Sequence, residues 1–117
     1  ICSDYERSKD FYTRILGFEV VQEVYRAARQ SYKLDLALRG HYTIELFSFP
    51  DSPARPSYPE ACGLRHLAFA VENVQAAIEW LKKNGVQAEP VRVDEYSGRR
   101  FSFFTDPDGL PLELYEN

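Results

Sequence analysis

The chain has 117 residues, of which 44% are hydrophobic, and a formal net charge of −4 with an isoelectric point near 5.2. One domain of this size can bury a hydrophobic core, and the acidic balance argues against nucleic acid or an anionic membrane as a partner. No apolar run approaches the roughly 20 residues that span a bilayer. Two cysteines outside any CxxC spacing predict reduced, buried thiols in a cytoplasmic protein.

The first half of the chain reads as one helix followed by three strands. Asp4 can cap a helix over residues 5–16, which Gly17 ends. Strands are expected over 18–24, 32–38 and 42–49, where β-branched residues or alternating leucines dominate. Residues 50–63 contain four prolines and are predicted to form a connecting loop. The chain begins at Ile1 and holds no Met, so we expect it to lack its native N-terminus and most of a first strand.

The second half repeats this order, starting with a strand over 64–71. Asn73 is a plausible N-cap for an amphipathic helix that Gly85 ends, and Trp80 is expected on its apolar side, as Tyr12 is on that of the first helix. Extended chain over 86–93 and strands over 99–105 and 112–116 complete the half. We therefore predict a single α+β domain over 1–117, with module one at 1–49, a loop at 50–63 and module two at 64–117.

Three polar residues lie among apolar neighbours in these strands: Glu45, His66 and Glu113. Burial of an unpartnered carboxylate costs several kcal/mol, whereas two carboxylates and an imidazole together suit a first-row divalent cation with open coordination positions. Taken singly, a glutamate within a strand is more often an exposed-face or edge residue, and a lone histidine is more often a structural one. Their equivalent positions favour the metal hypothesis, because Glu45 and Glu113 lie on the last strands of the two halves and His66 on the first strand of the second.

Several short motifs support a resemblance to a known family. They are Leu16-Gly17-Phe18, Ile44-Glu45-Leu46, the segment 63–69, and the turn 104–109 leading into Leu112-Glu113-Leu114. With these motifs the chain resembles the vicinal oxygen chelate superfamily, which includes glyoxalase I, bleomycin resistance proteins and ring-cleaving dioxygenases. The segments 23–26, 47–50 and 59–63 are similar to the YaeR-type branch of glyoxalase I relatives.

The resemblance implies two tandem βαβββ modules that form a half-open barrel around one divalent metal ion, Ni²⁺, Zn²⁺, Mn²⁺ or Fe²⁺. The implied ligands are Glu45, His66 and Glu113, with a further His on the missing first strand. The implied activity is that of a glyoxalase I-like lyase or isomerase, which acts on a small α-oxo-aldehyde adduct or related vicinal-oxygen substrate through a metal-stabilised enediolate. Glu113 is the first choice for the proton-transferring base and Glu45 the second. A homodimer and a small-molecule partner, with a thiol adduct as one candidate, are also expected.

Two alternatives from other functional classes stay open. A ring-cleaving dioxygenase normally shows two His and one Glu around Fe²⁺, so the additional carboxylate of Glu45 argues against it. A non-catalytic binding module of the same fold generally loses the ligand set that is retained here. The expected substrate contacts also differ from the glyoxalase pattern. By the resemblance, bacterial glyoxalase I enzymes bind glutathione through an Arg and an Asn, and this chain has Ile1 and Phe49 at the corresponding positions. The residues that could substitute for these contacts are Arg26, Arg65, Arg99 and Arg100.

Overall fold

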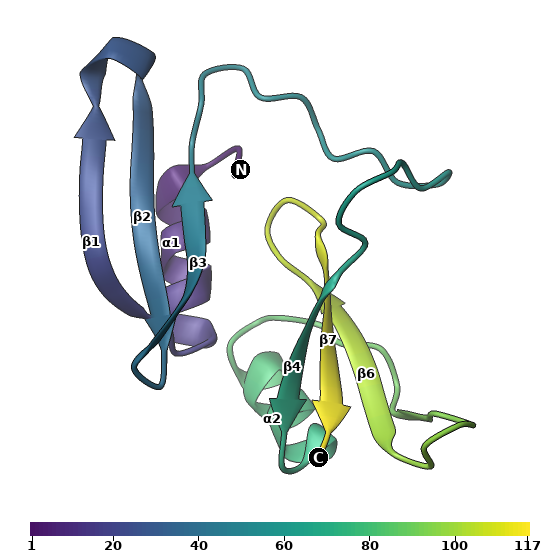
Figure 1. The fold of residues 1–117 in the computed structure, drawn as a ribbon. Coiled ribbons are helices and arrows are strands. Elements are labelled where there is room, and N and C mark those ends of the chain that lie inside the picture. The colour runs from purple at the N-terminus through teal and green to yellow at the C-terminus, as the bar shows by residue number, and fades with distance from the viewer. The chain divides into compact units, whose positions relative to one another are not determined.

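The computed structural model describes all of residues 1–117, which divide into two compact units, Ile1–Arg55 and Pro56–Asn117. Unit 1 holds a three-stranded sheet and unit 2 a four-stranded sheet, each with helical structure beside it (Figure 1). The predicted α+β class and the repeated strand and helix order are therefore confirmed.

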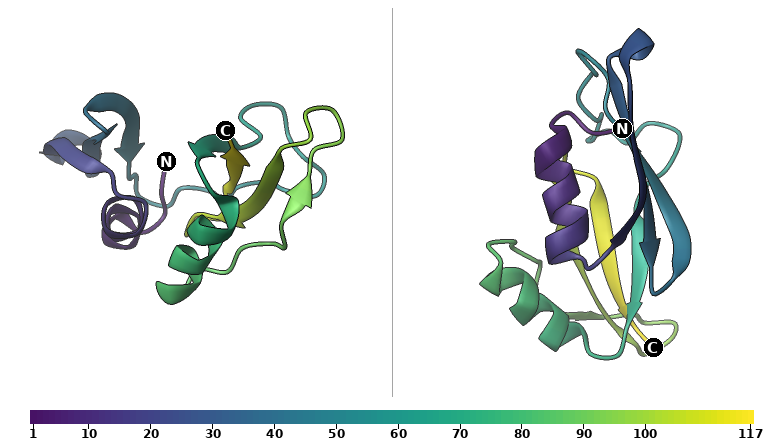
Figure 2. Two further views of the ribbon diagram at one scale, coloured as in Figure 1. Left: turned by 90° about the horizontal axis from the view of Figure 1, so that it is seen from below. Right: turned by 90° about the vertical axis from the view of Figure 1, so that its left-hand side faces the viewer.

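Unit 1 is a β-meander with a helix on one of its faces. The helix α1, Tyr5–Asp10, continues as the π-helical turn η1, Phe11–Ile15. The strands β1, β2 and β3 pair antiparallel in sequence order, with a short 3-10 turn before β2. They span Glu19–Arg26, Ser31–Leu38 and His41–Phe47, and the 3-10 turn η2 spans Ala27–Arg29. Figure 2 shows α1 lying along one face of these strands, which leaves the opposite face open within the unit.

The sequence signals that start the helix and fill the core act as predicted. The side chain of Asp4 accepts a hydrogen bond from the backbone N–H of Arg7 at 3.1 Å, so it is the N-cap of α1. On β2, Leu34 and Leu36 project toward the helix-covered face and are fully buried. Period-2 alternation then places Lys33 and Asp35 on the open face of the same strand. The two faces of β2 are thus an apolar core and a charged surface.

A β-bulge in the β2–β3 hairpin changes which residues share the open face. Cα pairing runs from Asp35 with Glu45 to Ala37 with Tyr42, so β3 carries one residue more than β2 between these pairs. A bulge of this kind re-aims side chains relative to a regular strand. Tyr42 therefore lies on the same face as Asp35 and Glu45, although it is three residues before Glu45 in the chain.

Unit 2 combines one parallel and two antiparallel strand pairs in the order β4-β7-β6-β5. The strands span Leu67–Val71 (β4), Arg92–Val93 (β5), Arg100–Thr105 (β6) and Pro111–Glu116 (β7), and the helix α2 spans Val74–Lys83. Strand β4 runs parallel to β7 because α2 and its connections return the chain to the same sheet. Asn73 caps α2 by accepting a hydrogen bond from the N–H of Ala76 at 2.9 Å, as predicted.

Three details differ from the sequence prediction. Strand β4 begins at Leu67, so His66 immediately precedes the strand instead of lying within it. The stretch expected to be extended over 86–93 forms a ladder only at Arg92–Val93. Trp80 is 50% exposed, so its predicted apolar position was wrong. Val74 and Leu81, seven residues apart, occupy the buried side of α2, and Trp80 is about 100° away from Leu81 around the helix.

None of the helices combines the length and apolarity that a bilayer crossing requires.

Candidate functional site

His66 and Glu113 form the pair of predicted ligands that unit 2 brings together. The Nε2 atom of His66 lies 3.2 Å from the Oε2 atom of Glu113, and both side chains are partly buried. Glu113 lies on β7 between Ala68 of β4 and Phe103 of β6 in the sheet register, and the imidazole of His66 meets the ring of Phe103 edge-on at a centroid distance of 5.2 Å. Since directly paired residues share a face, these groups lie on one surface of the sheet.

The separation of these two atoms suits a shared cation. Imidazole nitrogens and carboxylate oxygens bind Zn²⁺-like ions at about 2.0–2.2 Å, so two ligands at tetrahedral or octahedral angles lie about 3.0–3.4 Å apart. The observed 3.2 Å falls in this range. The donor types fit the divalent ion that the sequence predicts. The two side chains could hold such an ion between β7, which carries Glu113, and the residue that precedes β4.

Glu45, the third predicted ligand, lies on the open face of unit 1 in a network of four polar side chains. The Nζ atom of Lys33 lies 2.7 Å from Oδ1 of Asp35 and 3.1 Å from Oε1 of Glu45. The hydroxyl of Tyr42 hydrogen-bonds to the same two carboxylates. We call Lys33, Asp35, Tyr42 and Glu45 the hairpin cluster.

The hairpin cluster keeps both of its carboxylates ionised. Hydrogen bonds from Tyr42 and then Lys33 hold the pKa of Glu45 below its usual range, and the ammonium of Lys33 does the same to the pKa of Asp35. Loss of hydration and the two neighbouring acids raise the pKa of Tyr42 to about 12. At neutral pH the face therefore presents two carboxylates, one ammonium and one phenol, and Glu45 is in the charged form that metal ligation requires.

The predicted ligands belong to different units, Glu45 to unit 1 and the pair His66 and Glu113 to unit 2. Within neither unit do three or more His, Cys, Asp or Glu side chains gather in a way that could hold a metal ion. The structure brings His66 and Glu113 together, and the complete three-ligand set stays a prediction.

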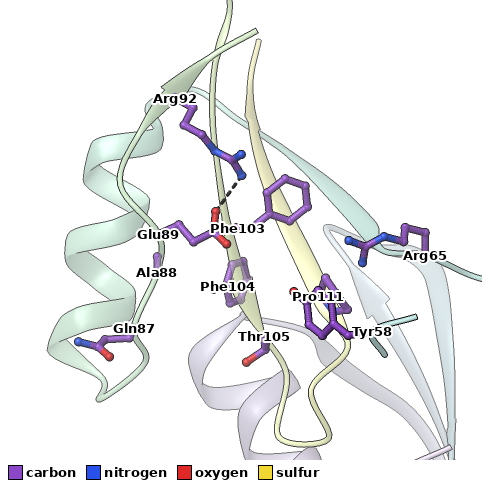
Figure 3. Close-up of a pocket in the computed structure, with 10 residues that line it drawn as sticks. All are labelled: Tyr58, Arg65, Gln87, Ala88, Glu89, Arg92, Phe103, Phe104, Thr105 and Pro111. Atoms are coloured by element: carbon purple, nitrogen blue, oxygen red, sulfur yellow. Dashed lines mark hydrogen bonds and ion pairs between the residues drawn. The ribbon is translucent and has the colours of Figure 1, made fainter. Parts of the chain in front are cut away.

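Two cavities open on unit 2. The larger, of about 710 Å³, is drawn in Figure 3 with Arg92 and Glu89 at one end and Arg65 across Phe103 from them. The smaller, of about 410 Å³, has Glu113 in its wall. Its other lining residues are Arg92, Val93, Asp94, Glu95, Tyr96, Phe101 and Tyr115. The smaller cavity therefore offers a space in which a small molecule would meet the Glu113 carboxylate.

Guanidinium groups stacked on phenylalanine rings recur in both units. Arg26 lies over Phe47 and Phe49, with its Cζ atom 4.9 and 5.7 Å from the ring centroids. Arg92 lies over Phe101 and Phe103 at 4.8 and 5.6 Å. Such stacking holds the planar guanidinium in place while leaving its edge for hydrogen bonds.

Sequence reasoning missed most of the hairpin cluster. The alternation in β2 placed Lys33 and Asp35 opposite the buried leucines, which is a signal for a charged face. The bulge that adds Tyr42 to this face carries no comparable signal, because Thr43 is an ordinary strand residue. The stacking of Arg26 on Phe47 and Phe49 also could not be predicted, because it depends on distances between neighbouring strands.

Comparison with known proteins gives a consistent family assignment. The family model of the Glyoxalase/Bleomycin resistance protein/Dioxygenase superfamily matches residues 1–114. The chain is 62% identical over 116 residues to the uncharacterized protein YaeR of Escherichia coli K12, covering 99% of this chain and 90% of YaeR. It is 61% identical to the uncharacterized protein YwkD of Bacillus subtilis 168, with 99% and 91% covered. A glyoxalase family protein from Enterococcus faecalis has a solved structure that superposes with a TM-score of 0.92 at 51% identity, over 97% of this chain and 90% of that one.

More distant relatives carry different named functions. The lactoylglutathione lyase of Escherichia coli O157:H7 is 30% identical over 97% of this chain and 84% of its own length. The structure of TnmS3, an antibiotic binding protein from Streptomyces sp. CB03234, matches with a TM-score of 0.71 at 27% identity, over 97% of this chain and 87% of that one. Catalysis and binding thus both occur on this fold. The chain belongs to the glyoxalase/bleomycin resistance protein/dioxygenase superfamily.

Proposed function

We propose that this protein is a metal-dependent, glyoxalase I-like lyase or isomerase that acts on a small α-oxo-aldehyde adduct or a related substrate with vicinal oxygens. The observation that carries the proposal is the His66–Glu113 pair, which lies at the spacing of two ligands of one cation. The neighbouring cavity, with Glu113 in its wall, supports it. The likeness to a lactoylglutathione lyase supports the reaction class.

In this proposal Glu45, His66 and Glu113 hold one divalent ion, which is Ni²⁺, Zn²⁺, Mn²⁺ or Fe²⁺. When bound, the ion supplies Lewis-acid stabilisation of the negative charge that develops on the vicinal oxygens of the substrate. Glu113 takes a carbon-bound proton from the substrate and returns it to the neighbouring carbon, which converts a thiohemiacetal into a thioester. Glu45 is the second choice for this base. Phe103, beside His66, limits the access of water to the reacting carbon.

Arg26 is the residue we propose to bind an anionic group of the substrate. Of the arginines that could replace the missing glutathione contacts, Arg65 and Arg100 are ion-paired with Glu60 and Glu116. Arg99 is an exposed residue directly before β6. The guanidinium of Arg26 instead stacks on Phe47 and Phe49 and donates a hydrogen bond to the hydroxyl of Ser31 at 2.9 Å. Its charge is therefore available to a carboxylate, and Phe49, which stands in place of the expected Asn, is part of its support.

We further propose that the protein works in the cytoplasm as a homodimer, with module one at 1–49 and module two at 64–117. Cys2 is buried as expected, but Cys62 is exposed, so the prediction of a buried thiol was wrong there; an exposed free thiol suits a reducing compartment. The βαβββ fold supports the dimer, because the superfamily closes its half-open sheets by pairing modules.

Metal analysis of the full-length protein, followed by a methylglyoxal assay across several thiols, tests the proposed function. We expect one divalent ion per Glu45–His66–Glu113 set, turnover that a chelator abolishes and added metal restores, and loss of metal in His66→Ala. Fe²⁺ with O₂ consumption would instead identify a dioxygenase. A protein without metal that still binds a small molecule would identify a binding module of the kind that TnmS3 represents.

A further inference from the structure

Lys33 lies against the carboxylate of Glu45, the metal ligand proposed on the open face of unit 1. Its Nζ atom lies 3.1 Å from Oε1 of Glu45 and 2.7 Å from Oδ1 of Asp35, so one ammonium is shared by two carboxylates on the same face. Asp35 and Glu45 are directly paired across β2 and β3. A cation that binds Glu45 has to compete with this ammonium for the carboxylate oxygens.

Asp35 gives Lys33 a second partner that does not depend on Glu45. The Asp35 side chain is only 10% exposed, and its contact with Lys33 is the shorter of the two. If Lys33 releases Glu45, its charge stays compensated by Asp35, which it already contacts. Release of an ammonium with no other partner on this face would instead leave it near an incoming cation without compensation.

We propose that Lys33 is a positioning residue that holds Glu45 in the metal-free protein and is displaced onto Asp35 when the divalent ion binds. This inference rests on the proposed role of Glu45 as a ligand. Lys33 then acts in two ways. It holds the Glu45 carboxylate on the open face before the ion arrives, and it lowers the affinity for the ion by occupying one carboxylate oxygen.

Variants of Lys33 and Asp35 distinguish two explanations: movement of the Lys33 ammonium from Glu45 to Asp35, and a simple change in the charge near the metal. We expect Lys33→Met to bind Zn²⁺ about tenfold more tightly than the wild type, which corresponds to about 1.4 kcal/mol. Asp35→Asn leaves Lys33 with Glu45 alone, so we expect about tenfold weaker Zn²⁺ binding. In the Lys33→Met background, Asp35→Asn should change the affinity by less than about threefold, because there is no ammonium left to hold.

Zn²⁺ titration in competition with a chromophoric chelator measures these affinities on the full-length protein, with Ni²⁺ as a second probe. Lys9→Met is a matched control, since Lys9 forms a comparable ion pair with Glu23 at 2.6 Å. Glu23 pairs with Leu34 in the register and so lies on the helix-covered face, away from Glu45. The Lys9 variant is expected to bind Zn²⁺ as the wild type does. Lys33→Gln provides a second substitution should Lys33→Met unfold.

The outcomes distinguish this inference from the proposed function. A wild type that binds neither Zn²⁺ nor Ni²⁺ would overturn both. A wild type that binds metal, with an equal loss on Asp35→Asn in both backgrounds, would overturn the exchange alone and identify Asp35 as a simple charge or a ligand. Crystal structures with and without Zn²⁺ give a direct readout. The Lys33 Nζ to Glu45 distance is expected to exceed about 4 Å, the ion-pair limit, in the loaded form while the Asp35 contact persists.

Discussion

His66 and Glu113 meet because β4 and β7 are parallel neighbours. The register pairs Leu67 with Leu112 and Ala68 with Glu113, so His66 comes two residues before the direct neighbour of Glu113 and its side chain reaches that carboxylate diagonally. The 3.2 Å separation of His66 Nε2 and Glu113 Oε2 is therefore a consequence of sheet topology. The parallel pairing brings together two residues that are far apart in the sequence of unit 2. Glu113 lies on a central strand of the sheet and is held more rigidly than a ligand on a loop would be.

Glu113→Gln is expected to abolish turnover while at least part of the metal stays bound. Gln keeps the shape and one oxygen of the side chain but cannot accept a proton. The substitution should therefore remove the function of a general base completely, whereas it should weaken metal binding only in part. Turnover and metal content are measured on the same sample. The control is Glu116→Gln, which lies on the same strand and pairs with Arg100, and which we expect to keep its activity. Unchanged turnover with full metal in Glu113→Gln would remove this residue from the mechanism.

Tyr42→Phe is expected to raise the pKa of Glu45 toward its ordinary value of 4.5. The hydroxyl of Tyr42 is the largest cause of the lowered pKa and Lys33 the second, so the phenyl ring removes the stronger of the two hydrogen bonds. A ¹³C NMR titration of the Glu45 carboxyl in the metal-free protein measures the change. A midpoint that does not move would show that the bulge at Thr43 fails to bring Tyr42 to this carboxylate in solution.

The sequence predicted the elements of the fold better than it predicted the site. Regular spacing identified both helices, their Asp4 and Asn73 caps and the buried leucines of β2, because these depend on local periodicity and backbone chemistry. The hairpin cluster depends on a bulge and a cross-strand register, which no local pattern encodes. Trp80 shows the limit of inferring burial from a repeat, since the equivalent Tyr12 is buried and Trp80 is not.

Glu23→Gln is expected to destabilise the protein at neutral pH and to have little effect in acid. Glu23 accepts hydrogen bonds from Lys9 and Tyr5, which tie α1 to β1 and hold the pKa of Glu23 below its usual value. A carboxyl whose folded pKa is depressed stabilises the fold above its unfolded pKa, near 4.5, and loses that contribution as pH falls through the folded pKa. Urea unfolding of both proteins between pH 7 and pH 3 checks this. A difference that persists unchanged at pH 3 would contradict it.

Arg26→Met is expected to raise the KM for a carboxylate-bearing thiol adduct several-fold while leaving the KM for a neutral thiol adduct nearly unchanged. Methionine retains contact with Phe47 and Phe49 but carries no charge, so only anion recognition is removed. Parallel assays with glutathione and 2-mercaptoethanol adducts of methylglyoxal measure both values. Arg14→Met, which removes an exposed ion pair with Asp10 on the helix, is the control and is expected to alter neither. An equal change for both substrates in Arg26→Met would indicate a structural role for the stack.

The protein is expected to sediment as a homodimer of twice the 13.5 kDa chain mass at micromolar concentration. Unit 1 has one sheet face that its own helix does not cover, and large side chains such as Val21 and Tyr42 are more than half exposed. A stable dimer requires about 800 Å² of buried surface per partner, and pairing of modules is how the superfamily provides it. Analytical ultracentrifugation across a dilution series measures the association.

Because the proposed ligands lie in different units, a dimer that forms its metal site between chains would also become more stable when metal is added. A single monomeric species at micromolar concentration, with and without Zn²⁺, would contradict the predicted assembly.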